Sequence, residues 1–167
     1  GYAHAWRFRH PSPWDYMFFM SNALHRDLGW FWNDWLFTTD AVDGSIQNVT
    51  TSGGRTVVTV HQAGQMPSPV VLNVHFAPTG PAIRRMRNAV MIDDSTATVT
   101  WPVDVWFNGS RTFRATLDFG PRRIERIVLD PHCRFPDNDV QDNTWPRQPA
   151  PAAPAEGRGF GGGRFGM

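Results

Sequence analysis

The sequence predicts an α+β protein in which a short helical segment precedes an antiparallel β-sandwich and a disordered Pro/Gly-rich tail. Three patterns in the 167 residues predict this order. Apolar residues recur with helical spacing over residues 1–43 and alternate with polar residues over residues 44–145. Residues 146–167 are rich in Pro and Ala and then in Gly, so they cannot bury enough apolar surface to offset chain entropy. These bounds define the three expected parts.

The first well-marked helix is expected to begin at Ser12. Ser12 can cap the helix, Pro13 suits the first helical position, and Asp15 lies three residues after the cap. The stripe that follows, at helical spacing, is Trp14, Met17, Phe18, Ser21 and Leu24. This spacing places the five side chains on one face of the helix.

A second helix, expected from Asp27 to about Thr38, contains three tryptophans and two phenylalanines. Asp27 is the expected N-cap, because its carboxylate can accept a hydrogen bond from a backbone N–H two or three residues further on. One face of this helix contains Leu28, Phe31, Trp32, Trp35 and Leu36. Such a stripe is typical of a buried face, and a platform that stacks sugars or bases is the less favoured alternative. Together with Trp14 and Phe18, this face is expected to form an interface with another domain.

Short strands are expected from residue 44 onward, separated by turn residues. Residues 56–60 follow Ser52-Gly53-Gly54, which is typical of a tight hairpin turn. Residues 70–76 and 124–129 alternate in the same way. About six such strands favour an antiparallel β-sandwich.

The longest alternating run leads into a second hairpin signal. Its apolar face contains Ala97, Val99, Trp101, Val103, Val105 and Phe107. Pro102 within the run indicates an edge strand or a bulge. Asn108-Gly109 is the strongest hairpin signal in the chain, and the alternation resumes at residues 113–117. We therefore expect a strand pair around this turn.

Composition limits the functions of the chain. The formal net charge is +1, so no overall field attracts nucleic acid or a membrane surface. A single cysteine, Cys133, excludes an internal disulfide and a cysteine-based zinc site. No apolar run has the length of a membrane span, and no signal peptide is visible. The first residue is Gly and not Met, which suits a fragment or a processed product.

Several segments resemble zinc metallopeptidases of the aminopeptidase N type, in their bacterial and often secreted branch. Residues 10–16 (HPSPWDY) and 27–39 (DLGWFWNDWLFTT) resemble the end of the catalytic region of that family. Residues 102–109 (PVDVWFNG) resemble a strand and turn of the β-sandwich module that follows it, and residues 130–145 resemble the segment that ends such chains. The resemblance implies that residues 1–43 complete an upstream catalytic domain of the same polypeptide. It also implies that the full protein binds zinc, cleaves peptides and is secreted or periplasmic.

This chain lacks the motif that gives that family its activity. The family binds zinc through a His-Glu-x-x-His helix and a later Glu, because two His one turn apart present their imidazoles on one face. The six His of this chain include no such pair, and its only Glu residues are Glu125 and Glu156. We therefore expect neither a catalytic residue nor a cofactor here, with zinc bound elsewhere in the full-length protein.

Other candidate sites are weaker. Asp137, Asp139 and Asp142 lie in an acidic loop that resembles a calcium site but lacks the central Gly and the terminal Glu of an EF-hand loop. Asp residues also favour turns through their own side-chain hydrogen bonds. His61 and His75 lie on expected strands and could form a metal pair across a sheet, although a solvent-facing or hydrogen-bonded His is the default.

Two functions stay open at the level of sequence. In the first, the chain is the non-catalytic C-terminal part of a metallopeptidase, and the upstream domain covers its apolar helix face. In the second, it is a stand-alone β-sandwich module that binds carbohydrate or protein through exposed Trp30, Trp32 or Trp106. Nucleic acid is not an expected partner, because the two arginines of the Gly-rich tail would release too few counterions.

Overall fold

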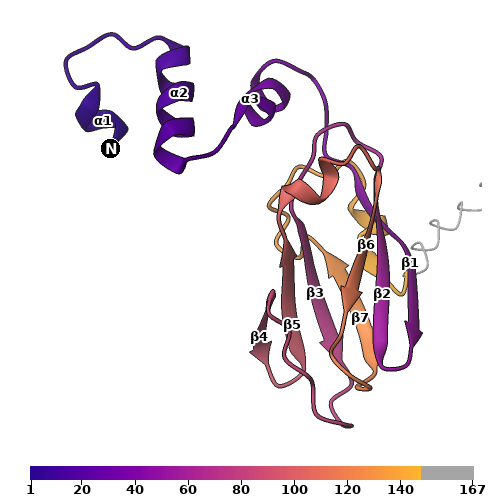
Figure 1. Ribbon diagram of the computed structural model, residues 1–167. Helices are drawn as coiled ribbons and strands as arrows, with labels where there is room; N and C mark the ends of the chain where they lie inside the picture. The colour runs from indigo at the N-terminus through magenta and orange to yellow at the C-terminus, as the bar shows by residue number, and fades with distance from the viewer. Residues whose placement is uncertain (148–167) are drawn as a thin grey trace, which may run out of the picture.

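The computed structural model describes residues 1–147 and shows a helical segment followed by two antiparallel sheets (Figure 1). The helices are α1 (Tyr2–Ala5), α2 (Pro13–Leu24) and α3 (Gly29–Leu36). This is the α+β order that the sequence predicts. The expected disordered tail lies, from residue 148 on, outside the described residues.

The two sheets have three and five strands. The smaller has the order β1-β2-β6, with the bounds Gly44–Ser52, Arg55–Gln62 and Thr112–Leu117. The larger has the order β4-β5-β3-β7-β8, with the bounds Ala89–Asp93, Thr96–Trp101, Val70–Phe76, Ile124–Leu129 and Thr144–Trp145. Two 3-10 helices, η1 (Val103–Trp106) and η2 (Val140–Asp142), lie between strands. All the paired strands of both sheets are antiparallel.

The core lies where the inner faces of the two sheets meet, as in a β-sandwich. Successive side chains of a strand point to opposite faces, so alternate residues of each strand enter the core. The largest fully buried side chains are Val58, Val60, Val70, Leu72, Val74, Val99, Leu117, Phe119 and Ile127. The rings of Phe76 and Phe119 meet edge to face, with centroids 5.0 Å apart. The apolar residues of the alternating segments are therefore what joins the two sheets.

Local signals in the sequence were correct at the start of α2 and at the first hairpin. The Ser12 hydroxyl accepts a hydrogen bond from the Asp15 N–H, and the Asp15 carboxylate accepts one from the Ser12 N–H at 2.8 Å, which completes a capping box. The turn between β1 and β2 consists of Gly53 and Gly54, with φ of 58° and 78°. Positive φ at both central residues is what a two-residue hairpin requires, and glycine adopts it without strain.

The prediction of one long strand that leads into a hairpin at Asn108-Gly109 was wrong. β5 ends at Trp101, Pro102 leads into η1, and the Trp106 side chain turns into the core. Gly109 has a φ of 79° and does form a tight turn, but β5 pairs with β3 and β4 while β6 pairs with β2. The Asn108 turn therefore carries the chain from one sheet to the other. Pro102 is also not on an edge strand, because it lies outside the strands, at the start of η1.

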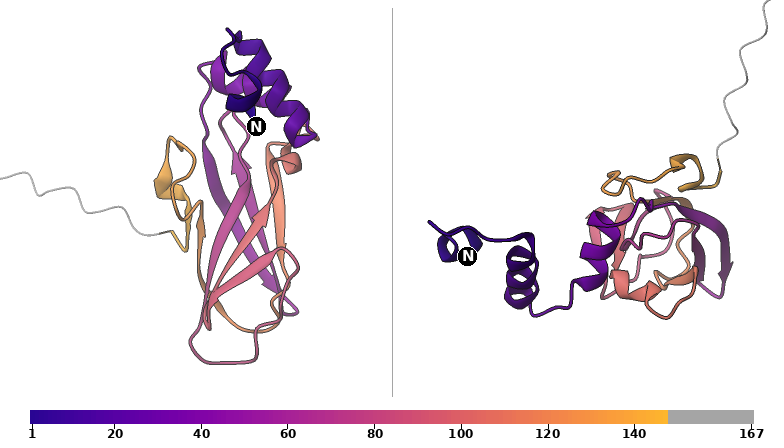
Figure 2. Two further views of the ribbon diagram at one scale, coloured as in Figure 1. Left: turned by 90° about the vertical axis from the view of Figure 1, so that its left-hand side faces the viewer. Right: turned by 90° about the horizontal axis from the view of Figure 1, so that it is seen from above.

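The helices stand beyond one end of the sandwich. Figures 1 and 2 show α3 close to the sheets and α2 and α1 progressively farther away. The loop after β2 fixes the segment that links α3 to β1, because the Ala63 N–H donates to the Asp43 carbonyl at 2.8 Å and the Met66 N–H donates to the Ala41 carbonyl at 3.2 Å. Trp30 on α3 meets Phe107 edge to face, with centroids 5.4 Å apart. Most of the surface of α2 therefore lies away from the sheets.

Candidate binding groove

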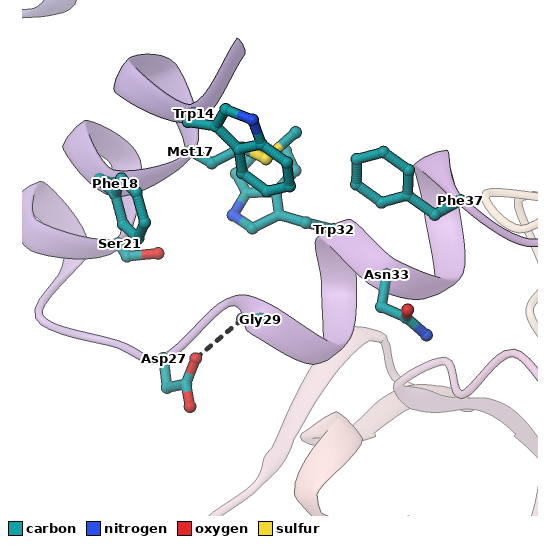
Figure 3. A pocket seen from close by; sticks show the side chains of 9 residues that line it. All are labelled: Trp14, Met17, Phe18, Ser21, Asp27, Gly29, Trp32, Asn33 and Phe37. Atoms are coloured by element: carbon teal, nitrogen blue, oxygen red, sulfur yellow. Dashed lines mark hydrogen bonds between the residues drawn. The ribbon is translucent and has the colours of Figure 1, made fainter.

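An apolar groove of about 340 Å³ lies between α2 and α3. Its lining residues are Trp14, Met17, Phe18, Ser21, Asp27, Gly29, Trp32, Asn33 and Phe37. Figure 3 shows the α2 side chains Trp14, Met17 and Phe18 on one side and Trp32 and Phe37 on the other. The groove thus combines most of the stripe expected on α2 with one residue, Trp32, of the stripe expected on α3.

The chain between the helices sets their relative position. α2 ends at Leu24, and His25 caps it with a left-handed φ of 51° and an N–H that donates to the Asn22 carbonyl at 3.2 Å. The Asp27 carboxylate then accepts a hydrogen bond from the Gly29 N–H at 2.8 Å. Asp27 thus makes a hydrogen bond of the expected kind and satisfies one of the free donors at the start of α3. The prediction that Asp27 is the N-cap was wrong, because Leu28 occupies that position. The two helices are therefore connected by a short and hydrogen-bonded turn.

Aromatic contacts connect α2 to the far end of α3. The rings of Trp14 and Phe37 stack at 5.8 Å with an angle of 13° between their planes. Tyr16 meets Trp32 edge to face, also at 5.8 Å. The groove nevertheless stays open, because Trp14, Phe18 and Phe37 keep 57%, 66% and 59% of their surface exposed. Contiguous apolar exposure of this kind usually marks an interaction site.

The seven residues expected at a domain interface are only partly gathered in this groove. Trp14, Phe18 and Trp32 line it. Leu28, Phe31 and Trp35 are half-buried outside it, and Leu36 is 56% exposed. Phe31 and Trp35 pack against each other with centroids 5.7 Å apart. The expected continuous stripe is therefore split between the groove and a second cluster.

Sequence patterns missed Asn33 and Phe37 as groove residues. Phe37 follows the last residue of α3 and has a φ of −122°, so helical spacing does not place its ring. Asn33 lies one position beyond Trp32 and its side chain donates to Asp34 at 2.9 Å. The aromatic character of Phe37 was the one signal that could have included it.

A second hollow, of about 350 Å³, lies where α3 approaches the sandwich. Its lining includes Trp30, Asp34, Phe107 and Arg111, and the Arg111 guanidinium donates to the Gly64 carbonyl at 2.6 Å. Trp106 is only 9% exposed, and its indole N–H donates to the Ser68 carbonyl at 2.8 Å. The expectation of a solvent-facing Trp106 was therefore wrong, while Trp30 is half-buried at the hollow.

The acidic loop is held by hydrogen bonds to the protein itself. Asp137 accepts from the Gly44 N–H at 3.2 Å and from the Asn143 amide at 3.0 Å, and Asp139 accepts from the Gln141 N–H at 2.9 Å. No group of three or more His, Cys, Asp or Glu within residues 1–147 is arranged to hold a metal ion. The calcium candidate Asp137, Asp139 and Asp142 therefore gains no support from the geometry.

The proposed histidine pair was also wrong in its geometry. His61 lies on β2 and His75 on β3, and these strands belong to different sheets. The His61 ring is 3.4 Å from the Thr112 hydroxyl, within hydrogen-bonding reach. His61 therefore has the neighbour of an ordinary hydrogen-bonded histidine.

Asp142 gives the loop a testable pH dependence. Burial, with a smaller contribution from the negative charge of Asp139, raises the pKa of its carboxyl above the ordinary 3.8, and one of its oxygens is buried without a hydrogen-bond partner among residues 1–147. Because the folded chain binds this proton more tightly than the unfolded chain, the ionised carboxylate destabilises the fold at neutral pH, and this effect fades as the pH falls through the folded pKa. Asp142→Asn should therefore raise the urea midpoint at pH 7, and the gain should vanish below pH 3.8. A gain of equal size at both pH values would contradict this assignment.

None of the helices within residues 1–147 has the length and apolar content to cross a lipid bilayer. No protein-family model, curated protein or solved structure matches the chain.

Proposed function

We propose that this chain is the non-catalytic C-terminal part of a zinc metallopeptidase of the aminopeptidase N type. In this proposal α2 and α3 pack against a helical catalytic domain that precedes them in the same polypeptide, and the β-sandwich lies behind them as a support. One observation carries the proposal. The groove between α2 and α3 presents three large aromatic side chains that are more than half exposed, at the end of the molecule farthest from most of the β-sandwich.

The position of the groove agrees with the family resemblance. Residues 10–16 span the start of α2, and residues 27–39 contain the whole of α3. These are the segments that resemble the end of the catalytic region in that family. The apolar surface that needs a partner is therefore formed by the segments whose counterparts would complete the catalytic domain.

Covering the groove would be strongly favourable. Complete burial of a large apolar side chain contributes about 1.5–3 kcal/mol. More than half of the surface of Trp14, Phe18 and Phe37 is exposed, so a partner could still bury it. Ser21, Asp27 and Asn33 at the groove add hydrogen-bonding groups that could fix the orientation of the partner. Such an interface would be a permanent one.

The chemistry of the full protein would lie outside this chain. Zinc and the peptide substrate would be bound by the catalytic domain, since no His-Glu-x-x-His motif occurs here. The secreted or periplasmic location that the family resemblance implies belongs to the same proposal. The role of the present chain would be to cover and support the catalytic domain.

The coding sequence directly upstream of Gly1 gives the first test. An open frame with His-Glu-x-x-His and a later Glu supports the proposal. An in-frame start codon close to Gly1 would refute it.

Variants in the groove give a second test. Phe18→Ser combined with Phe37→Ser should weaken binding to a separately expressed upstream polypeptide by at least about a hundredfold, because two partly buried anchors are lost. It should also lower the binding of a hydrophobic dye to the isolated chain. Val140→Ser is a matched control, since Val140 is 56% exposed and lies in η2. Titration calorimetry provides the affinities, and an equal loss in the control variant would count against the groove.

The alternative function is a stand-alone module that binds carbohydrate or protein through exposed tryptophan. The hollow beside Trp30 favours it, because it joins the Trp30 and Phe107 rings to the polar side chains of Asp34 and Arg111. This arrangement resembles a sugar site, with an apolar platform and polar groups at its rim. Titration with neutral oligosaccharides should then change the tryptophan fluorescence of the chain, and Trp30→Ala should abolish the change. A flat titration would remove this alternative for carbohydrates.

A further inference from the structure

The second half of β1 is a sheet edge without the features that usually prevent strand pairing. β1 is the first strand of the three-stranded sheet, and Figure 1 shows it at the free side of that sheet. At the start of the strand the edge is occupied, because the Gly44 N–H donates to the Asp137 carboxylate at 3.2 Å. Further along, residues 48–52 (NVTTS) contain no charge, no proline and no bulge. Open edges of this kind are templates for strand addition.

The other edge strands of the two sheets are protected. β6 carries the exposed Arg114, and β4 has a bulge between Met91 and Asp93. β8 has only two residues and is followed by Pro146. Charges, bulges, short strands and proline all discourage pairing at an edge. Within residues 1–147 the second half of β1 is therefore the edge most suited to another strand.

The backbone of this stretch has two residues directed at the open edge. Both glycines of the β1–β2 turn have positive φ, so this is a two-residue hairpin turn, in which the flanking Ser52 and Arg55 exchange hydrogen bonds. Residues that bond to the neighbouring strand alternate along an antiparallel pair. Because the register is regular from Asn48 to the turn, Val49 and Thr51 direct their N–H and carbonyl groups away from β2. No hydrogen bond joins these four groups to another part of residues 1–147.

A hollow of about 650 Å³ lies beside the same edge, between the two sheets. Its lining includes Thr51 from β1, Ile124 from β7 and Trp145 from β8. The inner face of β1 carries Val49, which packs against the core, and Thr51, whose hydroxyl lies 2.9 Å from that of the buried Thr56. The inner side chains of an added strand would therefore point towards this hollow.

The stretch is complementary to an antiparallel copy of itself. Val49 and Thr51 are spaced equally on either side of Thr50, so each finds the other as its partner in the second copy. The half-buried Val49 would then lie beside Thr51 of the other copy, next to the hollow. On the outer face Thr50 would lie opposite Thr50, and Asn48 opposite Ser52. All these pairs are free of like charges, and pairs of threonines across strands are favourable.

The ends of the stretch also match each other. In the same register the bulge at Gln47 of one copy lies opposite Gly53 in the turn of the other. An added Cβ at Gly53 would have nothing within 4 Å, so the turn leaves space for a neighbour. Bulge and turn together limit the ladder to five residues.

We propose that residues 48–52 of β1 pair antiparallel with the same residues of a second copy of this chain, about a two-fold axis at Thr50. Val49 of each copy exchanges backbone hydrogen bonds with Thr51 of the other. The two smaller sheets form one six-stranded sheet. Both of its outer edges are β6 strands with Arg114, so the assembly stops at a dimer and does not grow into a fibre.

The charge at position 50 provides the main test on the full chain. The wild type at about 100 μM should contain a weak dimer in analytical ultracentrifugation, because a ladder of five residues makes a small interface. Thr50→Lys and Thr50→Glu should each be monomeric, because like charges then meet across the axis. An equal mixture of the two variants should restore a heterodimer. Thr50 is exposed, so either substitution leaves the fold intact, which circular dichroism verifies.

Thr116→Lys is the matched control and should leave the dimer unchanged. Thr116 is also an exposed threonine, and it lies in the same row across the sheet as Thr50, with Val57 between them, but on β6 at the opposite edge. The proposal is overturned if the wild type is monomeric, if Thr50→Lys keeps the wild-type mass, if the control dissociates equally, or if the mixture stays monomeric. Association through the α2–α3 groove would leave Thr50→Lys at the wild-type mass, so this test is independent of the proposed function.

Disulfide formation tests the register. In a Cys133→Ser background, which removes the exposed free thiol, a mixture of Asn48→Cys and Ser52→Cys should form a covalent heterodimer on mild oxidation. Neither variant should crosslink with itself, because its two copies would lie four residues, or about 13 Å, apart along the paired strands. Equally fast crosslinking of either variant alone would overturn the register centred on Thr50.

Discussion

Replacing Leu72 with alanine is expected to lower the free energy of unfolding by about 2–5 kcal/mol. Leu72 is completely buried in β3, the central strand of the larger sheet, and lies opposite Val99 on β5 and Leu129 on β7. Neither neighbouring strand can close the space without breaking its own hydrogen bonds, so the truncated side chain leaves a cavity. Urea denaturation followed by tryptophan fluorescence measures the loss.

Val90→Ala is the control for this prediction, because Val90 is 66% exposed and its truncation should change the free energy of unfolding by about 0.5 kcal/mol or less. A loss below about 1 kcal/mol for Leu72→Ala would mean that the two sheets do not form one common core.

Replacing Gly64 with alanine is expected to cost about 3 kcal/mol, the upper part of the usual range for overpacking. An added Cβ would lie 2.1 Å from the Ala41 carbonyl oxygen and 2.7 Å from the Asp43 nitrogen. Both are backbone atoms, so no flexible side chain can move aside, and the loop after β2 holds their segment through hydrogen bonds to the Ala41 and Asp43 carbonyls. The strain would be relieved only by loosening the segment that links α3 to β1.

Gly53→Ala is the matched control for Gly64→Ala. Gly53 has a left-handed φ of 58° and nothing within 4 Å of an added Cβ. Its substitution should cost only the left-handed strain of about 1–2 kcal/mol. Thermal unfolding of both variants gives the comparison, and equal losses would show that the contact at Gly64 relaxes freely. Hydrogen exchange should also show faster opening around residues 41–43 in Gly64→Ala.

Some elements could be predicted at the level of single residues, because only neighbouring residues form them. The capping box at Ser12 and the Gly53-Gly54 turn depend on residues within three positions of each other, so the sequence contains all the atoms involved. The strands at 70–76 and 124–129 were also correct, and each is paired with a strand on both sides.

Strand pairing was not predictable, because alternation identifies a strand but not its neighbour. The Asn108-Gly109 turn shows this most clearly. Gly109 has a positive φ, and the Asn108 side chain accepts a hydrogen bond from the Ser110 N–H at 2.8 Å. Both features stabilise a tight turn whether it joins two sheets or two strands of a hairpin. β4 was not expected as a strand, since the exposed Val90 and Ile92 on an open edge weaken the contrast between its faces.

The candidate groove was predictable in composition but not in shape. Helical spacing correctly identified Trp14, Phe18 and Trp32 as members of apolar stripes. Which stripes face each other depends on the angle set by the turn at His25 and Asp27, and spacing within a helix does not contain that angle. Phe37 joined the groove for the same reason, through a stacking contact with Trp14 in the other helix.

The pairing of β2 with β6 has a consequence for how fast the chain folds. Thr56 lies opposite Leu117, so the smaller sheet is completed only after about sixty intervening residues have been brought into a closed loop. The β1–β2 hairpin closes across two glycines and can form within microseconds. Most of the other strand pairs join distant parts of the sequence. The expected folding time is therefore in the range of about milliseconds to seconds. During that interval the β1–β2 hairpin would leave the β6 side of β2 unpaired. Stopped-flow fluorescence should detect the pairing of β6 with β2 as the slow step.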